Sequence, residues 1–369
     1  MKILVTGAGG FLGKNLVAEL KNQGYEDLLL YTRNHTLKDL QEYTKKCEFV
    51  YHLAGVNRPE NEKDFMDGNY GFTSELLKLL KKNNNKSPIL ITSSIQAEKD
   101  NPYGISKKLG ENLLFEHSIE TGAEVFVYRL PNLFGKWSKP NYNTVVATYC
   151  YNIARDLDIQ VNNPDAELTL CYIDDVLEEF VKALEGNPNK NDNYCFVETP
   201  YTIKLGDLAS LIRGFKESRT NLSVPNMDDA LTKKLYSTYL SFLPKDQFAY
   251  DLKMNIDNRG SFTEFIRTPD RGQVSVNVSK PGITKGNHWH HTKNEKFLVV
   301  SGQGLIRFRN INTEEIIEYK VSSEKLIVVD IPVGYTHSIV NIGEDNLVTV
   351  MWVNESFNPE NPDTNFLEV

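Results

Sequence analysis

Short apolar runs alternate with helical stretches in the first part of the chain. Strands are predicted at Ile3–Thr6, Leu28–Thr32, Phe49–Leu53, Ile89–Ser93 and Glu124–Arg129. Helices are predicted between them at Leu12–Asn22, Phe72–Lys82 and Ser106–Glu120. Because strands that alternate with helices build a parallel sheet covered on both faces, this pattern predicts a doubly wound α/β domain.

The pattern changes twice further along the chain. From Pro131 to Ser241 it is less regular, and a substrate-binding lobe is expected there. After about Tyr250 the chain is β-rich, and its short apolar segments separated by turns predict an all-β sandwich or barrel. Pro244 breaks the helical pattern, so we expect two domains, at residues 1–245 and 250–369.

Composition limits the classes of partner and compartment. The 369 residues carry a formal net charge of −8, which is unfavourable for polyanions, so nucleic acid is not expected as a partner. No run approaches the roughly 18 apolar residues of a membrane span, and the chain start lacks the basic region of a signal peptide. The four cysteines show no CxxC spacing, which favours free thiols and a cytoplasmic location.

A glycine-rich turn follows the first predicted strand, where Thr6–Gly13 reads TGAGGFLG. Such glycines allow a tight turn, close approach of a pyrophosphate and close packing of helix on strand. The helix start then offers N–H donors and a positive dipole to phosphates. A structural turn is the alternative, but the context favours a Rossmann-type dinucleotide site. Its expected members are Gly7, Gly10, Phe11, Leu12 and Gly13.

Arg33 stands at the end of the second predicted strand. An NAD-binding domain usually carries an acidic residue near this place, which holds the ribose 2′-hydroxyl. No acid is present at Tyr31–Asn34, and an arginine can pair with a 2′-phosphate instead. We therefore expect NADP(H), with a surface arginine that binds no ligand as the alternative.

Several further segments resemble the extended short-chain dehydrogenase/reductases, in the branch that modifies nucleotide sugars. The matching motifs are Tyr51–Gly55, Asn69–Thr73, Thr92–Ser94, Tyr103–Lys107, Arg129–Gly135 and Tyr172–Val176. The resemblance covers about residues 1–200. It implies cofactor contacts for Leu53, Ala54 and Gly55, and substrate contacts for Asn69, Arg129 and Asn132.

The same resemblance implies a catalytic group of Ser94, Tyr103 and Lys107. In this chemistry a hydride moves between nicotinamide and a sugar carbonyl carbon, and the carbonyl oxygen gains a proton. Tyr103 would donate that proton, and Ser94 would hydrogen-bond the carbonyl. Lys107, one helical turn on, would lower the pKa of Tyr103 and hold the nicotinamide ribose. The alternative for Tyr103 and Lys107 is an ordinary helix start.

Two departures from the family pattern predict local differences. The stretch from Arg33 to Glu48 fits about one helix, where the family has helix–strand–helix, so one strand is expected to be missing. Ser94 precedes Tyr103 by only nine residues, and so short a loop is expected to open the site. The role of Ser94 therefore depends on how this short loop folds.

Two short motifs in the β-rich region resemble the two motifs of the cupins. The first contains Gly282, His288, His290, Glu295 and Gly302. The second contains Pro332, Gly334, His337 and Asn341, and lacks only its leading glycine. The resemblance covers about residues 255–355 and implies a metal-binding barrel.

The residue pattern independently indicates a metal site. His288 and His290 alternate on a predicted strand and so face the same way, and Glu295 begins the next strand. With His337 they supply three imidazoles and a carboxylate, which suit zinc, nickel, iron or manganese, and zinc is our choice. The alternative is a barrel whose histidines only hydrogen-bond one another.

A metal in a dry barrel can polarise a ketone and stabilise an enolate, which suits epimerisation beside a carbonyl. The sequence does not identify the base. Lys296 and Tyr335 lie near the motifs, but structural roles explain them equally well.

The order of a nucleotide-sugar reductase followed by a cupin resembles the bifunctional CapF-type family of capsular polysaccharide precursor enzymes. The resemblance implies a UDP-linked 4-keto-6-deoxy-N-acetylhexosamine on the L-fucosamine route. The cupin would epimerise it next to the ketone, and the reductase would then reduce the C4 ketone with NADPH to a UDP-N-acetyl-6-deoxy-L-talosamine-type product.

Two alternatives to this two-step enzyme stay open. One is a single-activity reductase whose cupin only dimerises or senses a ligand. The other is a non-enzymatic regulator that senses NADP(H). Because cupins often pair, a homodimer is expected in either enzyme.

Overall fold

The computed structural model describes residues 1–142, 144–198, 200–356, 358–360 and 362–369. The chain forms two compact units. The first comprises residues 1–213 and 228–244, and the second residues 214–227 and 245–369. Residues 214–227 precede the expected domain boundary yet pack with the second unit, where the backbone N–H of Arg267 donates to the carbonyl of Leu222 at 2.8 Å.

A mostly parallel seven-stranded sheet forms the centre of the first unit, in the order β2-β1-β3-β4-β5-β9-β8. Strands β1 to β5 are mutually parallel, and β8 joins antiparallel to β9. The strands are β1 (Ile3–Thr6), β2 (Leu28–Tyr31), β3 (Phe49–His52), β4 (Ile89–Ser94), β5 (Val125–Leu130), β8 (Lys190–Asn191) and β9 (Tyr194–Cys195). The predicted Rossmann-type sheet is thereby confirmed.

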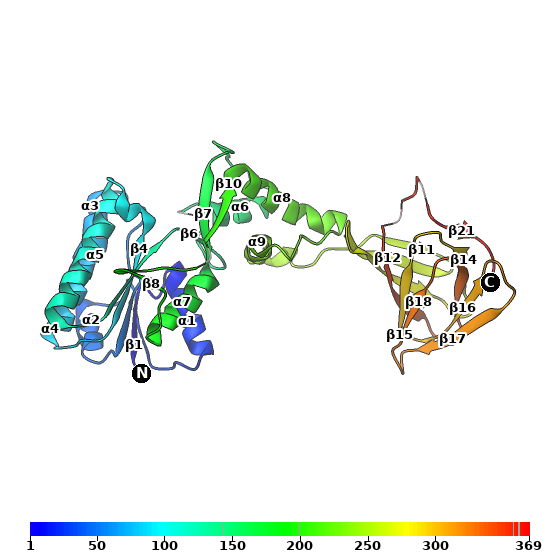
Figure 1. The fold of residues 1–369 in the computed structure, drawn as a ribbon, viewed down its shortest axis with the longest axis horizontal. Helices are drawn as coiled ribbons and strands as arrows, with labels where there is room; N and C mark the ends of the chain where they lie inside the picture. Colours follow the sequence, from blue (N-terminus) through cyan, green and yellow to red (C-terminus); the bar gives the residue numbers. More distant parts are fainter. Residues whose placement is uncertain (143, 199, 357, 361) are drawn as a thin grey trace. The chain divides into compact units, whose positions relative to one another are not determined.

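Helices cover both faces of this sheet (Figure 1). On one face α1 and α7 bury Leu16, Leu20 and Phe180 against the strands. On the other face α2, α4 and α5 bury Leu40, Leu76 and Leu114. These helices are α1 (Phe11–Asn22), α2 (Leu37–Thr44), α4 (Phe72–Lys82), α5 (Pro102–Thr121) and α7 (Ile173–Leu184).

The expected loss of one strand is confirmed in the part of the chain that is described. Only α2 connects β2 to β3, and β2 is the edge strand of the sheet. Thr36 caps α2 in a reciprocal capping box with Asp39, so the short connection is a well-formed helix.

The segments after β5 form a second, smaller sheet with its own helices. This sheet has the order β10-β7-β6, with β6 (Asn132–Phe134), β7 (Glu167–Tyr172) and β10 (Pro200–Lys204). The helices of this region are α6 (Val145–Ile153), α9 (Ala230–Leu240) and the first half of α8 (Leu205–Asn221), whose residues from 214 on belong to the second unit. A short α3 (Lys63–Phe65) lies earlier, after β3.

The second unit contains the predicted all-β domain, and its two antiparallel sheets confirm that fold class. The six-stranded sheet has the order β11-β12-β13-β20-β15-β18, and the five-stranded sheet β17-β16-β19-β14-β21. The first sheet consists of β11 (Met254–Asp257), β12 (Gly260–Thr268), β13 (Gly272–Ser279), β15 (Glu295–Ser301), β18 (Val328–Ile331) and β20 (Leu347–Val353). The second consists of β14 (Thr284–Trp289), β16 (Gln303–Asn310), β17 (Ile316–Ser322), β19 (Tyr335–Asn341) and β21 (Asn365–Phe366).

The six-stranded sheet has an unusual distribution of polarity. On β13 the inward side chains are polar and buried, among them Gln273, Ser275 and Asn277. The outward side chains of the same strand are valines. Because a solvated antiparallel sheet normally points its polar side chains outward, the alternation on β13 is inverted.

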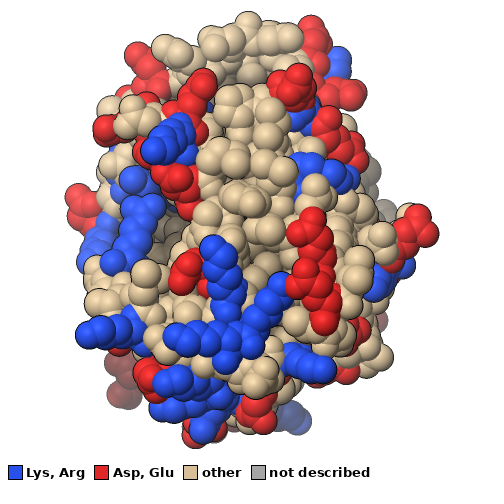
Figure 2. Space-filling model, turned by 90° about the vertical axis from the view of Figure 1, so that its left-hand side faces the viewer, with Lys and Arg blue, Asp and Glu red and all other residues tan. Residues whose placement is uncertain are grey.

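The surface seen in Figure 2 mixes acidic, basic and uncharged side chains on the side of the first unit that carries α4 and α5. Among the described residues, no helix combines the length and apolarity needed to cross a membrane.

Candidate functional site

The turn between β1 and α1 leaves no space for side chains at two of its glycines. Gly7 has φ +71°, and a Cβ there would lie 2.7 Å from the backbone nitrogen of Ala54. A Cβ on Gly13 would lie 2.3 Å from the carbonyl oxygen of Gly7. Gly10 caps α1 without a side-chain hydrogen bond, so the first amides, beginning at Phe11 and Leu12, keep their donors for a ligand.

The segments beside this turn come from the ends of β2 and β3. Leu53, Ala54 and Gly55 follow β3 directly, and the hydroxyl of Thr6 accepts the Ala54 N–H at 3.3 Å. Arg33 follows β2 and is exposed. The structure thus gathers the expected cofactor residues around the start of α1.

Tyr103 and Lys107 lie in the first turns of α5, and Ser94 ends β4. The Lys107 ammonium donates to the carbonyl of Thr92 at 3.1 Å and lies 5.9 Å from the centre of the Tyr103 ring. A Cβ on Gly55 would be 3.1 Å from Lys107 Nζ, so the lysine contacts the loop that follows β3.

The short connection between Ser94 and Tyr103 is compact. It forms a 3₁₀ turn at Ile95–Glu98 that packs against the start of α5. A Cβ on Gly104 would lie 2.2 Å from the carbonyl oxygen of Gln96, so this packing requires glycine. The Ser94 hydroxyl is close enough to Tyr103 to lower its pKa, so the short loop keeps the two hydroxyls together.

Burial shifts the acid–base properties of this group. It raises the pKa of the Tyr103 hydroxyl, and the neighbouring Ser94 hydroxyl offsets part of the rise. Burial lowers the pKa of Lys107 to about 8, although the nearby Glu111 carboxylate acts in the opposite direction. Burial, together with Lys107, lowers the pKa of His52 to about 3, and its neutral ring bridges the hydroxyls of Thr6 and Thr73.

Asn69 lies in a π-helical turn, Met66–Gly71, that leads into α4. Its side chain accepts the Val56 N–H at 2.9 Å, and donates to the Val56 carbonyl at 3.0 Å and to the Ser106 hydroxyl at 2.9 Å. Asn69 thus connects the loop after β3 to α5. It is buried, and these contacts show it as a residue that supports the site.

The other two predicted substrate contacts lie farther along the chain. Arg129 makes two hydrogen bonds to the buried Glu111, at 2.9 and 2.7 Å, and further bonds to Glu98 and Tyr194. Asn132 is exposed on β6 and donates to the Thr169 carbonyl at 3.2 Å. The guanidinium of Arg129 ties β5 to α5 through Glu111, and a substrate contact for either residue stays a prediction.

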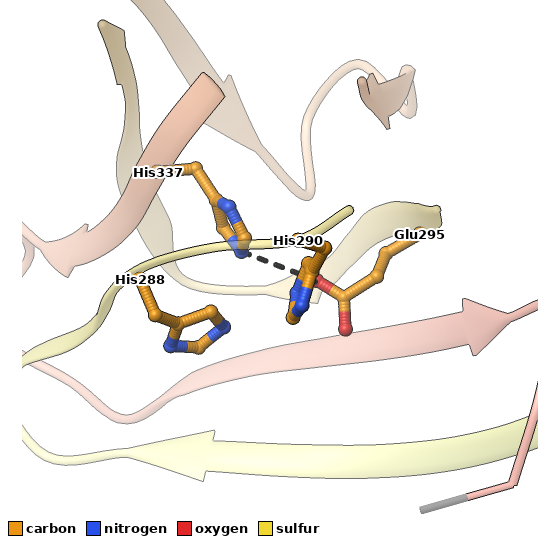
Figure 3. A group of neighbouring side chains, drawn as sticks. All are labelled: His288, His290, Glu295 and His337. Atoms are coloured by element: carbon orange, nitrogen blue, oxygen red, sulfur yellow. Dashed lines mark ion pairs between the residues drawn. The ribbon is translucent and has the colours of Figure 1, made fainter. Parts of the chain in front are cut away.

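In the second unit, His288, His290, Glu295 and His337 form one cluster (Figure 3). One ligand atom from each lies within 4.8 Å of all the others. His288 lies opposite His337 in the β14–β19 pair, Glu295 begins β15, and His290 follows the last residue of β14. The expected strand containing both His288 and His290 therefore ends one residue early, yet both rings reach the cluster.

The donor set fits a divalent metal. His290 Nε2, Glu295 Oε2 and both ring nitrogens of His337 are buried and make no hydrogen bond within the described chain. Burial, with the neighbouring His337 and His290, lowers the pKa of His288 to about 4, so its ring is a neutral ligand near pH 7. Burial opposes ionisation of Glu295, but the ring nitrogens of His290 and His337, at 3.7 and 3.2 Å from its Oε2, outweigh burial and lower the pKa. Buried atoms that make no hydrogen bond, on three histidines and one carboxylate, form a donor set that suits a divalent metal.

The cluster faces a cavity of about 1080 Å³ inside the second unit. Polar side chains of β13 line it, as does Lys285, which donates to Asn277 Oδ1 at 2.7 Å and to the Val278 carbonyl at 2.9 Å. Lys296 is exposed and pairs with Asp330, and neither Lys296 nor Tyr335 is among the described residues that line the cavity. Neither is therefore placed as a base. Sequence reasoning missed the polar lining, whose only signal is the inverted alternation on β13.

Comparison with known proteins agrees with this two-part organisation. Residues 3–195 match the NAD dependent epimerase/dehydratase family, and residues 255–365 match the polysaccharide biosynthesis C-terminal domain. A UDP-2-acetamido-2,6-beta-L-arabino-hexul-4-ose reductase from Pseudomonas aeruginosa is 47% identical over 99% of this chain and 98% of its own. The crystal structure of CapF from Staphylococcus aureus superposes with a TM-score of 0.95 at 56% identity, over 100% of both chains.

A more distant structure shows the fold of the first unit alone. UDP-glucose 4-epimerase from Thermotoga maritima has a TM-score of 0.56 at 19% identity, and covers 66% of this chain and 98% of its own. Fold and site together define a protein that uses a nicotinamide cofactor. The chain belongs to the NAD dependent epimerase/dehydratase family and, within it, to the CapF-type capsular polysaccharide precursor enzymes.

Proposed function

We propose that the first unit is an NADPH-dependent ketoreductase of a UDP-linked 4-keto-6-deoxy-N-acetylhexosamine. The observation that carries this proposal is the convergence of Ser94, Tyr103 and Lys107 beside the loop at Gly55. The reductase name of the Pseudomonas relative supports the reaction and the class of sugar nucleotide. A purely sensory protein would have no use for a buried proton donor, which weighs against the regulator alternative.

Each member of the group has a distinct task. When bound, NADPH supplies the hydride for the carbonyl carbon. Tyr103, protonated because of its raised pKa, donates its proton to the carbonyl oxygen, which Ser94 also hydrogen-bonds. The Lys107 cation stabilises the tyrosinate that results and holds the ribose hydroxyls next to Gly55.

The preference for NADPH rests on Arg33. Its exposed guanidinium follows β2, the place from which a dinucleotide-binding domain reads the ribose 2′-position. An arginine there adds charge-assisted hydrogen bonds to a 2′-phosphate that NADH cannot offer.

The second unit is proposed to hold zinc and to epimerise the same sugar next to its ketone. His288, His290, Glu295 and His337 would hold the ion, and a metal supplies Lewis acidity that stabilises an enolate. The polar side chains of β13 offer hydrogen bonds to sugar hydroxyls in the cavity. The cupin would act first, and the reductase would then yield a UDP-N-acetyl-6-deoxy-L-talosamine-type product on the L-fucosamine route.

One observation favours a second role for the β unit, as a dimer module. Val276, Val350, Leu298 and Val328 form a row across β13, β20, β15 and β18 on the outer face. Val274, Val278 and Val348 extend this row, and we call these seven residues the outer valine face. Burying such a face against a second copy would give the expected homodimer.

Two measurements test the two steps separately. We expect deuterium from heavy water to enter the keto-sugar nucleotide without NADPH, and Tyr103→Phe to lose reduction but keep this exchange. Absence of exchange in the wild-type enzyme would reject the epimerase step and leave the single-activity reductase. If the wild-type enzyme shows no deuterium exchange and His290→Ala no longer forms the oligomer, the β unit serves only in dimerisation or sensing.

A further inference from the structure

The chain ends in a segment, Pro362–Val369, that runs along the metal cluster, and we call it the C-terminal strap. Its strand β21 is an edge strand, in which Phe366 and Asn365 pair with His288 and Trp289 of β14. The Leu367 N–H also donates to the carbonyl of Asn287 at 3.0 Å. The strap therefore completes the hydrogen bonding of β14 at the residues that carry the first ligand.

The strap also binds the strand of the last ligand. Thr336, the neighbour of His337 on β19, donates its hydroxyl to the carbonyl of Leu367. On β16, Arg309 donates to the carbonyl of Glu368 at 2.6 Å. Three strands of the five-stranded sheet thus contact the strap.

Asp363 makes the most concentrated set of these contacts. Its carboxylate accepts the backbone N–H groups of His291 at 2.9 Å, Thr292 at 2.8 Å and Lys293 at 3.0 Å. The Thr292 hydroxyl donates to it as well, at 3.2 Å. These residues form the loop that joins His290 to Glu295, so one carboxylate fixes the backbone between two ligands.

The backbone of Asp363 also acts on a ligand directly. The Nδ1–H of His290 donates to the carbonyl oxygen of Asp363. This bond selects the tautomer that leaves the His290 Nε2 lone pair free. Nε2 is buried, lies 3.7 Å from Glu295 Oε2 and makes no hydrogen bond within the described chain. In metal sites, a ligating histidine is commonly oriented by a hydrogen bond that its other ring nitrogen donates.

We propose that Asp363 is a positioning residue of the metal centre. Its backbone carbonyl orients the ring of His290, and its carboxylate holds the loop from His291 to Lys293. The inference rests on the proposed metal site. Neither cupin-like motif contains Asp363, which lies 26 residues beyond His337 in the sequence. Loss of a hydrogen-bond partner that orients a metal ligand typically lowers metal affinity by about 10- to 100-fold.

The test compares full-length wild type with Asp363→Ala and Asp363→Asn, and uses Asp270→Asn as a matched control. Asp270 is an exposed carboxylate of the same unit that pairs only with its neighbour Arg271 among the described residues. The Kd for Zn²⁺ is measured by competition with a chromophoric chelator, and the visible spectrum of the Co²⁺-substituted protein reports ligand geometry. We expect the Kd of Asp363→Ala to rise about 10- to 100-fold, that of Asp363→Asn to rise less, and that of the control to stay unchanged.

Thermal unfolding with and without Zn²⁺ separates positioning from simple folding. A positioning role reduces the increase in Tm that Zn²⁺ produces, whereas a merely structural role lowers the Tm of metal-free and loaded protein equally. If Asp363→Ala keeps the wild-type Kd within threefold and the same Co²⁺ spectrum, the inference is overturned while the metal site stands. If wild type itself binds no Zn²⁺, the proposed metal centre fails, and this inference with it.

Discussion

His288 and His337 lie directly opposite each other across the antiparallel pair of β14 and β19, with ring centroids 4.7 Å apart. A bulge creates this pairing. Gly286 pairs with Ser338 and His288 with His337, so Asn287 is an extra residue in β14 and adopts φ +59°. Because of the bulge, Lys285 and His288 line the same cavity although they lie three positions apart.

We expect Gly286→Ala to weaken metal binding. Gly286 has φ +103°, and a Cβ there would lie 2.7 Å from the carbonyl oxygen of His337. The backbone must yield, which moves β14 away from β19 and His288 away from the other ligands. We expect at least a tenfold rise in the Kd for Zn²⁺, measured by competition with a chelator.

The matched control for this change is Gly282→Ala. Gly282 also has a positive φ, +74°, but a Cβ there meets nothing within 4 Å. Both variants carry the left-handed strain of about 1–2 kcal/mol, and only Gly286→Ala adds the clash. Equal Zn²⁺ affinities in the two variants would show that the bulge does not hold His288 in place.

The sequence predicted the parts of both sites that local spacing determines. Tyr103 and Lys107 are one helical turn apart, and the short stretch after Arg33 has room for one helix only. The glycine turn is equally local in the part where Gly13 packs against Gly7 and Ala8. These features follow from periodicity and chain length.

The remaining features depend on contacts between residues far apart in the chain, which produce no periodic pattern in the sequence. The insertion at Asn287 is visible only once β14 is paired with β19. The contact of Asp363 with His291 joins backbone to side chain across 72 positions. Arg129 carries a family motif, but its partner Glu111 comes from the buried side of α5, and that pairing appears only in the folded chain.

The reduction rate is expected to fall as pH rises through about 8. The pKa of Lys107 is lowered to about 8 by burial, so the lysine loses its charge there and no longer stabilises the tyrosinate. A profile of kcat/KM for NADPH-dependent reduction against pH measures this. Lys107→Arg keeps its charge and should lose the decline, whereas the control Lys108→Arg should retain it; a wild-type profile that is flat to pH 10 would contradict the assignment.

Burial of Lys107 also predicts how the free energy of unfolding depends on pH. Its folded-state pKa of about 8 lies below the ordinary lysine value of 10.5, so the unfolded chain binds more protons between these values. The free energy of unfolding therefore rises with pH across this window, and the burial of charged Lys107 costs stability below it. We expect Lys107→Met to remove this rise in urea titrations of cofactor-free protein; an unchanged pH dependence would show that Lys107 is not the titrating group.

Arg33→Ala is expected to reduce the preference for NADPH over NADH by about tenfold or more. The change removes a charge-assisted pair with the 2′-phosphate, and hydrogen bonds to charged groups contribute about 1.5–3 kcal/mol. The KM values for both cofactors measure the ratio. Lys38→Ala, which removes another exposed cation near the start of α2, serves as control. A parallel rise in both KM values would instead assign Arg33 a general structural role.

Val328→Asp is expected to convert a dimer to monomers. Val328 is 57% exposed in the single chain, so the fold tolerates a carboxylate there. In a dimer formed through the outer valine face, the same carboxylate would be buried without a partner, at a cost of several kcal/mol. Sedimentation velocity should show half the wild-type mass, with the far-UV spectrum unchanged. Ile119→Asp, which introduces the same charge at an 86% exposed position of the first unit, should stay dimeric. A Val328→Asp protein that remains dimeric would place the contact between copies on another surface, and the apolar outer face would then need a different partner.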